Sequence, residues 1–313
     1  MPFPFYIQVE PTTRCNLKCP YCTRNSYSKE DLKSDIDINS ILNFIKKSPL
    51  RVLKIQGMGE PFAYKYLEEI CIAAKRKNIA LETTTNGTTL LRNPDHIHIL
   101  INYFDIVNIS IDAGNKETFE LNRVGAKYED VLEGIKILVN KRNETKSRLR
   151  IRAAFVLTES NYNEIPDFVK TMKQIGVESC GFPEVENWKI PTDLDYEIYS
   201  SYYVNYIEKR PQIQKFIKSN FSTEEIHEHG LDYQLYRGKR KGNCDWMFYK
   251  GFITESGNLT PCCIRMENKY SIEKNKSIID NDFEESWNTG NAAEFRQSHL
   301  NNTPNVYCDN CPG

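Results

Sequence analysis

Short apolar or alternating runs recur along roughly the first 185 residues, and longer amphipathic stretches separate them. The runs favour strands, and the stretches between them repeat apolar residues three and four positions apart, which is typical of helices. Strands that alternate with helices predict an α/β protein with a parallel sheet, curved or closed, and helices outside it. The expected strands are Tyr6–Glu10, Val52–Gln56, Ala80–Thr85, Ile106–Ile111, Arg148–Leu157 and Ser179–Pro183, and the clearest helices are Ile38–Lys47, Tyr64–Lys77, Pro94–Asn102, Glu129–Arg142 and Ile165–Ile175.

Several expected strands carry polar residues on one face. In the fourth strand, Asn108, Ser110 and Asp112 share a face and the apolar residues share the other. A fully packed barrel would carry branched apolar residues on both faces. Polar inner faces therefore predict a hydrated cavity, with functional groups at the carboxyl ends of the strands. A half-exposed antiparallel sheet is the alternative, but the intervening helices argue against it.

The remaining residues follow a different pattern. Trp246–Thr254 and Asn258–Ile264 resemble two strands joined by a hairpin turn, and Asn281–His299 resembles a helix. Before them lies an aromatic-rich bridge whose tyrosines at 196, 199, 203 and 206 follow helical spacing, which packing explains best. We expect three parts: a barrel over residues 1–187, a helical bridge over 188–240 and a small C-terminal domain over 241–313.

Composition limits the class of protein. Among 313 residues, 40% are hydrophobic and 27% are charged, which indicates a globular chain. The formal net charge of −1 gives no basic bias toward nucleic acid or an anionic membrane surface. No apolar run approaches the ~20 residues of a membrane span, and the N-terminus lacks the features of a signal peptide. We therefore expect a cytoplasmic protein that binds neither nucleic acid nor membrane.

The chain has ten cysteines, which is more than core packing explains in a compartment where stable disulfides are rare. Cys15, Cys19 and Cys22 lie within eight residues of each other. A closed zinc site takes four protein ligands, and so does a fully ligated 4Fe–4S cluster. Three thiolates therefore favour a metal centre that leaves one position for another ligand over a structural zinc site.

The chain resembles the radical S-adenosylmethionine (SAM) enzymes in four motifs, which occur in the family's order. Cys15-x3-Cys19-x2-Cys22 matches the cluster motif, and Tyr21 takes the usual aromatic position before the last cysteine. Residues 56–61, Gln-Gly-Met-Gly-Glu-Pro, resemble the G-G-E-P segment, although a methionine replaces the usual small residue. Residues 85–87, Thr-Asn-Gly, and 109–112, Ile-Ser-Ile-Asp, resemble two further signatures. The resemblance covers about residues 5–185 and implies a partial (β/α)6 barrel.

This resemblance implies radical chemistry. Three thiolates hold three irons of a 4Fe–4S cluster, and the fourth iron binds the amino and carboxylate groups of SAM. An electron donor such as flavodoxin or ferredoxin is expected, and reductive cleavage of SAM yields a 5′-deoxyadenosyl radical that abstracts hydrogen from a C–H bond. Glu60 is expected near the amino group of SAM, and Ser110 and Asp112 near its ribose. The SAM-binding residues that the resemblance implies are Tyr21, Gly57, Met58, Gly59, Glu60, Thr85, Ser110, Asp112 and Arg123.

A second set of cysteines lies near the C-terminus. Cys244, Cys262, Cys308 and Cys311 follow the spacing C-x17-C-x45-C-x2-C, and Gly257 stands five residues before the second of them. This spacing resembles the auxiliary-cluster domains called SPASM or, in a shortened form, twitch. The resemblance implies a second 4Fe–4S cluster with four protein ligands, suited to electron transfer or support. A four-cysteine zinc ribbon is the alternative.

Two features of the sequence narrow the class of substrate. The tail is similar to that of 2-deoxy-scyllo-inosamine dehydrogenase and related aminoglycoside sugar dehydrogenases and epimerases, which implies an aminocyclitol, aminosugar or glycoside substrate. The chain begins at the first strand, so no peptide-recognition domain is expected before it. Arg152, Glu184 and Glu186, at or just past strand ends, are candidates for binding substrate hydroxyl or amino groups. A peptide maturase and a non-catalytic Fe–S or zinc scaffold remain as alternatives.

Two outcomes of hydrogen abstraction remain open. In dehydrogenation, a carbon radical beside a hydroxyl loses a proton and an electron, which the auxiliary cluster accepts. In epimerisation, a thiol returns a hydrogen atom from the opposite face. Cys263, beside the expected ligand Cys262, and Cys180, in the sixth strand, are the candidate donors. We favour dehydrogenation, because the auxiliary cluster supplies the acceptor that it requires.

Overall fold

A computed structural model describes residues 3–26, 32, 34–183, 185, 197–228, 231, 244–266, 268–272, 283–303 and 308. All six expected parallel strands are present in the predicted order, each within the predicted range: β1 (Tyr6–Val9), β2 (Val52–Ile55), β3 (Ala80–Thr85), β4 (Ile106–Ser110), β5 (Arg150–Ala154) and β6 (Ser179–Gly181). The helices between them are α1 (Ile38–Lys47), α2 (Leu67–Arg76), α3 (Pro94–Tyr103), α4 (Lys116–Asn122), α5 (Tyr128–Thr145) and α6 (Ile165–Ile175).

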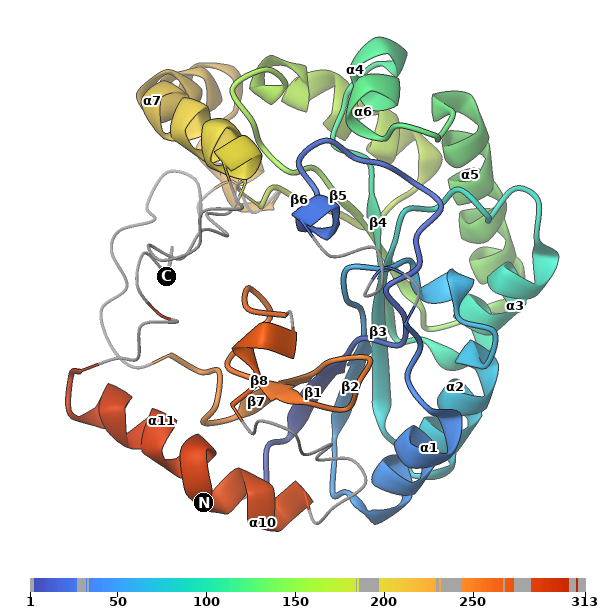
Figure 1. Cartoon of the computed structure of the whole chain (residues 1–313). Coiled ribbons are helices and arrows are strands. Elements are labelled where there is room, and N and C mark those ends of the chain that lie inside the picture. The colour runs from blue at the N-terminus through green and yellow to red at the C-terminus, as the bar shows by residue number, and fades with distance from the viewer. Residues whose placement is uncertain are drawn as a thin grey trace.

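The helices form an arc outside the curved sheet, as Figure 1 shows. The order of strands is β6-β5-β4-β3-β2-β1-β7-β8, and neighbours β1 to β6 are all parallel. This arrangement confirms the expected α/β fold, a partial barrel with helices on its outer face. The sequence patterns do not predict the short helix α4. Asn115 caps its N-terminus, because its side chain accepts a hydrogen bond from the backbone of Thr118, which stabilises a helix of only seven residues.

The C-terminal hairpin joins the same sheet. Strand β7 (Lys250–Ile253) pairs parallel with β1, so that Tyr6 lies beside Lys250, and β8 (Leu259–Thr260) pairs antiparallel with β7. The sequence predicts the hairpin but not its pairing with β1. Both strands are shorter than expected, and residues 261–266 form turns rather than the end of a strand. The hairpin therefore extends the sheet beyond its first strand (Figure 1).

Side chains alternate between the two faces of the sheet. On β2, Leu53 and Ile55 are fully buried on the side of the helices, whereas Lys54 on the other face is partly accessible. Strands β3 and β5 repeat this alternation. The hydrophobic core thus lies between the sheet and its helices, and the inner face is polar, as the sequence predicts.

Four further helices are described: α7 (Glu197–Asn220), α8 (Thr223–Glu228), α10 (Phe283–Asn288) and α11 (Gly290–Leu300). The last two replace the single helix expected over Asn281–His299, because the chain breaks at Thr289, which has extended backbone angles. Tyr206 on α7 is fully buried, as the packing interpretation of the tyrosine pattern requires. Tyr196 and the side chains of Tyr199 and Tyr203 lie outside the described residues. Short 3-10 turns occur at Thr23–Ser26, Pro61–Ala63, Tyr162–Glu164 and Asn268–Tyr270.

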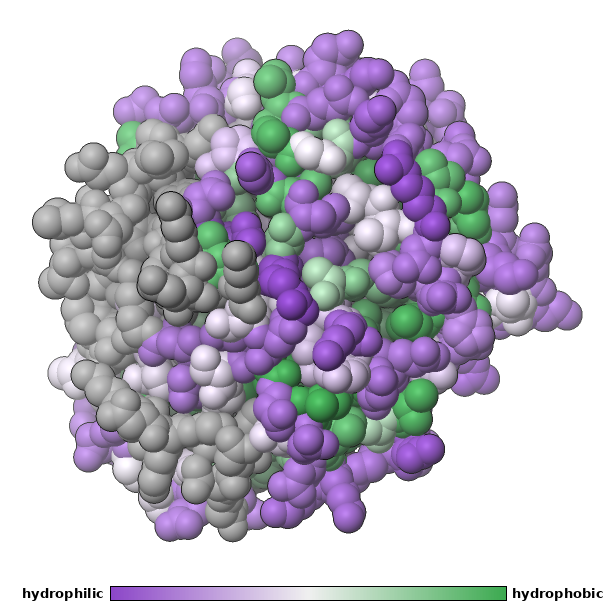
Figure 2. All heavy atoms as spheres, turned by 45° about the vertical axis from the view of Figure 1, so that its right-hand side comes forward, coloured by the Kyte–Doolittle hydropathy of each residue, from purple (hydrophilic) through white to green (hydrophobic). Residues whose placement is uncertain are grey.

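The surface over the outer helices is largely hydrophilic, with hydrophobic side chains in small separate groups (Figure 2). Within the described part of the chain, no helix has both the length and the apolar character that a membrane crossing needs.

Candidate active site

A cavity of about 240 Å³ lies at the carboxyl ends of strands β1 to β4. The loop after β1, the segment after β2 and the ends of β3 and β4 supply its wall, as expected for a parallel sheet whose functional groups gather at one edge. The structure thus brings together most of the residues singled out in the sequence. Those that line the cavity are Cys15, Cys19, Tyr21, Cys22, Gly57, Met58, Gly59, Glu60, Thr85, Ser110 and Arg123.

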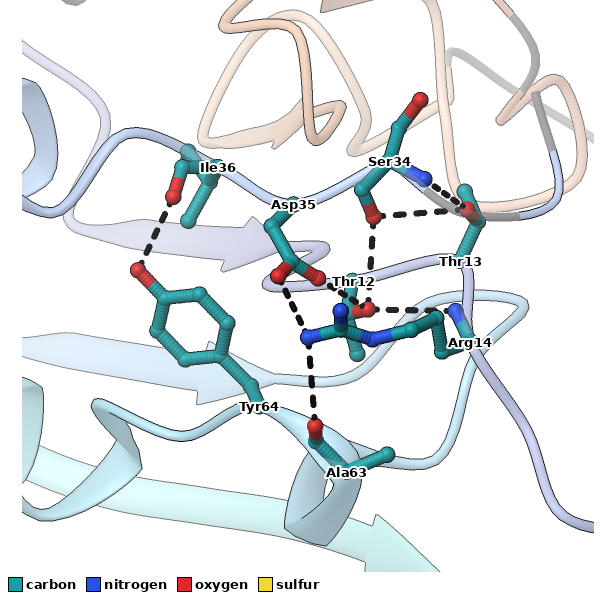
Figure 3. A network of polar contacts seen from close by, with 8 residues as sticks. All are labelled: Thr12, Thr13, Arg14, Ser34, Asp35, Ile36, Ala63 and Tyr64. Carbon is teal, nitrogen blue, oxygen red and sulfur yellow. Dashed lines mark hydrogen bonds and ion pairs between the residues drawn. The ribbon is translucent and has the colours of Figure 1, made fainter. Parts of the chain in front are cut away.

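A polar network fixes the start of the cysteine loop (Figure 3). The side chain of Thr12 donates to Asp35 at 2.6 Å and accepts from the backbone N–H of Arg14 at 3.1 Å. The guanidinium of Arg14 pairs with Asp35 and also donates to the carbonyl of Ala63. These bonds tie the loop to two neighbouring segments, which orders the backbone that leads into Cys15.

The three loop thiols receive hydrogen bonds from their surroundings, Cys22 from the backbone N–H of Arg24. Cys15 accepts from the backbone N–H of Leu17 at 3.5 Å and from Asn86 at 3.9 Å, and Cys19 accepts from the guanidinium of Arg123 at 3.9 Å. Burial raises the pKa of all three thiols, that of Cys22 to about 11. Donors aimed at sulfur suit thiolates that ligate a cluster, since they spread the negative charge.

All three loop cysteines line the same cavity. A closed zinc site and a fully ligated 4Fe–4S cluster each take four protein ligands, so three thiolates leave one position of a metal centre for another ligand.

Two glycines let the backbone approach closely beside the cavity. A methyl group at Gly59 would overlap the backbone carbonyl of Thr12 and would lie only 2.7 Å from that of Arg14. A methyl group at Gly57 would overlap the side chain of Glu10. The space that these glycines leave is therefore required by the protein itself, before any ligand is considered.

Glu60 lines the cavity but is already held by donors. Its carboxylate accepts from the hydroxyl of Thr85 at 2.7 Å, from the backbone N–H of Asn86 at 2.8 Å and from that of Phe62 at 3.3 Å. Burial raises the pKa of Glu60, and these donors oppose the rise. The residue thus ties the segment after β2 to the end of β3 while one side of it faces the cavity.

Asp112 does not line the cavity and is fully buried. It accepts a hydrogen bond from the hydroxyl of Tyr21, forms an ion pair with Arg123 and accepts from the backbone N–H of Val156 at 2.7 Å. Both of its oxygens are therefore used by the protein. Asp112 holds Tyr21 and Arg123 against the cavity. Its contact with the ribose of SAM, which the resemblance implies, stays a prediction.

A buried pair of carboxyl groups escapes the sequence analysis. Glu10, fully buried at the end of β1, accepts from the backbone N–H of Met58 at 2.6 Å, and its second carboxyl oxygen has no N–H donor. That group lies within hydrogen-bonding reach of Glu255, in the turn between β7 and β8. Burial, followed by the charge of Glu255, raises the pKa of Glu10 well above its ordinary value. In the sequence, Gln8 and Glu10 alternate with apolar residues in the first strand, which is the one local signal for a polar group here.

The candidate hydrogen donors lie in different places. Cys263 packs against a small cluster of Met58, Phe252 and Met266, of which Met58 and Met266 line the cavity. Cys180 pairs in register with Ala153, which is buried on the helix side of the sheet, and it packs against the hydrophobic core there. This register turns Cys180 away from the barrel interior, so the structure does not support it as a donor.

The remaining candidates are only partly described. Arg152 lies on the inner face of β5, whereas Glu184, Glu186 and Cys311 lie outside the described residues. Cys244 precedes β7, Cys262 lies in the turn after β8, and the thiol of Cys308 lies 3.3 Å from His299. The expectation that Cys262 belongs to a strand is wrong, because β8 ends at Thr260.

Two family models match the chain. The model of the radical SAM superfamily matches residues 9–172. The SPASM model, described as an iron–sulfur cluster-binding domain, matches residues 244–312. The first match covers the barrel with the cavity, and the second covers the hairpin and the C-terminal cysteines.

Curated relatives share the barrel region at modest identity. A tungsten-containing aldehyde ferredoxin oxidoreductase cofactor-modifying protein of Pyrococcus furiosus is 28% identical over 181 residues, which are 56% of this chain and 49% of that protein. The antilisterial bacteriocin subtilosin biosynthesis protein AlbA of Bacillus subtilis is 25% identical over 277 residues, 84% of this chain and 56% of that protein. The chain thus spans about half the length of these curated relatives.

Solved structures share the fold. Native anSMEcpe with bound AdoMet has a TM-score of 0.61 at 18% identity, over 99% of this chain and 88% of that chain. BtrN in complex with AdoMet and 2-DOIA has a TM-score of 0.53 at 13% identity, over 100% of this chain and 94% of that chain. At these identities the likeness concerns the fold alone.

Proposed function

The chain belongs to the radical SAM superfamily, and on that premise we propose that it is an oxidoreductase acting on a small polar substrate. The radical SAM domain binds SAM and a 4Fe–4S cluster, and the SPASM domain binds auxiliary iron–sulfur clusters. We assign the first cluster to Cys15, Cys19 and Cys22, and one auxiliary 4Fe–4S cluster to Cys244, Cys262, Cys308 and Cys311. The substrate class that we favour is an aminocyclitol, aminosugar or glycoside.

The observation that carries this proposal is the cavity that all three loop cysteines line at the mouth of a polar barrel. Arg123 and Tyr21 form part of the wall and are fixed by Asp112, so they can orient a polar cofactor without further rearrangement. Ser110 offers a hydroxyl at the end of β4 that can donate to and accept from ribose hydroxyls. When bound, SAM and the cluster supply a carbon-centred radical that removes a hydrogen atom from a substrate C–H bond.

The proposed groups account for every hydrogen atom, proton and electron that leaves the substrate during its oxidation. The substrate carbon would lose one hydrogen atom to the radical and its hydroxyl would lose a proton. The auxiliary cluster, which Cys244, Cys262, Cys308 and Cys311 would hold, would accept the remaining electron, and the product would be a ketone. A reduced flavodoxin or ferredoxin supplies the electron that starts each turnover. The hairpin of the SPASM region belongs to the same sheet as the barrel, so this electron would not have to cross between separate sheets.

The experiment is a substrate screen with two readouts. Reduced holoprotein is incubated with SAM and candidate aminocyclitols, aminosugars, glycosides and short peptides, and 5′-deoxyadenosine is measured with the substrate mass. We expect a sugar-like compound to lose two hydrogen atoms as 5′-deoxyadenosine accumulates. A modified peptide with unchanged sugars would replace this proposal by a peptide maturase, which the similarity to AlbA favours.

Epimerisation is the second candidate, and the position of Cys263 favours it. Cys263 packs against the cluster of Met58, Phe252 and Met266, two members of which line the cavity, where a thiol could return a hydrogen atom to a substrate radical. Cys263→Ala is compared with the unsubstituted protein in deuterated water. An oxidised product formed at an unchanged rate supports dehydrogenation; an inverted, deuterium-labelled product that the variant cannot form establishes epimerisation.

A further inference from the structure

The inner face of the barrel carries an excess of positive charge directly below the cavity. Lys54 on β2 and Arg152 on β5 lie on this face, since their strand neighbours are buried on the helix side. Lys250 on β7 lies beside Tyr6 in register. Glu82 on β3 is beside Lys54 in register and supplies a carboxylate in the same layer. Three cations thus face one carboxylate in this layer.

The charges act on each other across the interior. Strands β2 and β5 are separated by β3 and β4, so Lys54 and Arg152 can approach each other only through the barrel. The pKa of Lys54 is lowered first by burial; the charges of Lys250 and Arg152 lower it further, whereas Cys263 and Glu82 oppose the change. The side chains of Lys54 and Arg152 therefore point toward the same internal space.

Two of the three cations have no partner in the described structure. Lys250 lies 3.6 Å from Asp245, and Glu82 accepts a hydrogen bond from Tyr6 at 3.5 Å. Neither Lys54 nor Arg152 makes a hydrogen bond or an ion pair with any residue that the structure describes. The charge of Glu82 acts on Lys54 without a hydrogen bond or an ion pair between the two side chains. Cations inside a protein that no described side chain binds directly are costly, and such groups point to a function.

The two cations lie one layer below the cavity wall. Lys54 precedes Gln56 by two residues on the same face, and Arg152 pairs with Asn108, which precedes Ser110 by two. Gln56 and Ser110 both line the cavity. Two residues of a strand span about 7 Å, so a substrate of sugar size placed below the cavity would reach these side chains.

We propose that Lys54 and Arg152 form an anion-binding subsite for the substrate. The substrate is then a sugar-like molecule with a carboxylate or a phosphate group, and not an aminocyclitol whose ammonium groups both residues would repel. The planar guanidinium of Arg152 can bind either group with two hydrogen bonds, and Lys54 adds a point charge. This inference rests on the proposed function and narrows its substrate class.

The test measures binding without turnover. Holoprotein with SAM, but with no reductant, is titrated with glucose, glucosamine, glucuronate and glucose 6-phosphate by calorimetry or ligand-observed NMR. Glucuronate or glucose 6-phosphate should bind about tenfold tighter than glucose and glucosamine, which is the effect of one charge-assisted hydrogen bond. The stronger of the two anionic probes tells carboxylate from phosphate. Added salt should weaken only the anionic probes.

Variants test whether Lys54 and Arg152 cause the preference for anionic probes. Lys54→Met and Arg152→Met should each reduce it, and the double variant should remove it, whereas the exposed control Arg148→Met should leave it intact. Unchanged iron content shows that the variants are folded. Equal or tighter binding of glucosamine, a preference that survives in the double variant, or no anionic binding at millimolar concentration overturns the subsite. An oxidised neutral or cationic sugar would refute this inference alone; anionic binding without any oxidised product would refute the proposed function alone.

Discussion

The carboxyl group of Glu10, at the end of the first barrel strand, is a hydrogen-bonding neighbour of the carboxyl group of Glu255, in the turn of the C-terminal hairpin. Both residues are buried. Glu10 also accepts the backbone N–H of Met58, and Glu255 accepts from Ser256 at 2.8 Å and from Asn268 at 2.9 Å. Burial and the charge of Glu255 raise the pKa of Glu10, which favours its protonated form where the barrel, the cavity wall and the hairpin meet.

This pair predicts a pH dependence of stability. The pKa of Glu10 is raised in the folded protein, so its protonated form favours folding below the ordinary value of 4.5. That contribution is lost as the pH rises from this value through the folded pKa, with a slope of up to about 1.4 kcal/mol per pH unit. Glu10→Gln keeps an acceptor for Met58 and a donor for Glu255 without a proton to lose. The variant should therefore unfold at higher denaturant concentration than the unsubstituted protein at alkaline pH.

The control for this effect is Glu117→Gln, a substitution at an exposed helix position. Its unfolding free energy should follow that of the unsubstituted protein at every pH. Parallel pH profiles for Glu10→Gln and the unsubstituted protein would show that Glu10 is ionised in the fold, contrary to this account.

A side chain at Gly59, beside the cavity, is expected to clash with the backbone. Gly59→Ala places a methyl group against backbone carbonyls of Thr12 and Arg14, which cannot move without breaking the cysteine loop. We expect a loss of about 2 kcal/mol or more in the free energy of unfolding, together with loss of iron. Gly181→Ala is the matched control, because a methyl group there meets no atom within 4 Å. Normal stability and iron content in Gly59→Ala would contradict this packing.

Breaking the buried ion pair of Asp112 with Arg123 is expected to lower the free energy of unfolding by more than Gly59→Ala does. Asp112→Ala leaves Arg123 without its counter-charge and Tyr21 without its acceptor, which should cost about 3–5 kcal/mol in chemical denaturation. Tyr21→Phe removes one hydrogen bond and should cost about 1 kcal/mol. Glu129→Ala breaks the exposed pair with Lys116 and should leave stability nearly unchanged. A small effect of Asp112→Ala, similar to that of Glu129→Ala, would refute the positioning role of Asp112.

The sequence predicts the strands and helices well where the pattern is local. Leu53, Lys54 and Ile55 alternate as a strand with one apolar face, and the structure buries them accordingly. The pairing of β7 with β1 depends on contacts between distant segments, which no local pattern encodes. The break at Thr289 was missed for a related reason, since the apolar periodicity continues through it.

The site, too, could be predicted from the sequence only where it depends on local motifs and not on contacts between distant segments. Motif positions identified the residues that line the cavity, because each motif follows a strand end. The role of Asp112 could not be predicted, since its partners Tyr21 and Val156 lie on other strands' loops. The orientation of Cys180 depends on the register of β6 with β5, which the three-residue strand leaves open in the sequence. Glu10 and Glu255 meet only after the hairpin joins the sheet.

The most direct test of the account is SAM cleavage by anaerobically reduced protein, measured as 5′-deoxyadenosine together with iron content. We expect the unsubstituted protein to hold about eight irons if both clusters are 4Fe–4S, and to cleave SAM. Cys19→Ala should abolish cleavage and lose about half of the iron. Cys71→Ala, at a core cysteine on α2 remote from the cavity wall, should retain both. Cleavage by Cys19→Ala at the unsubstituted rate, or a protein that binds zinc and no iron, would contradict the assignment of the cavity.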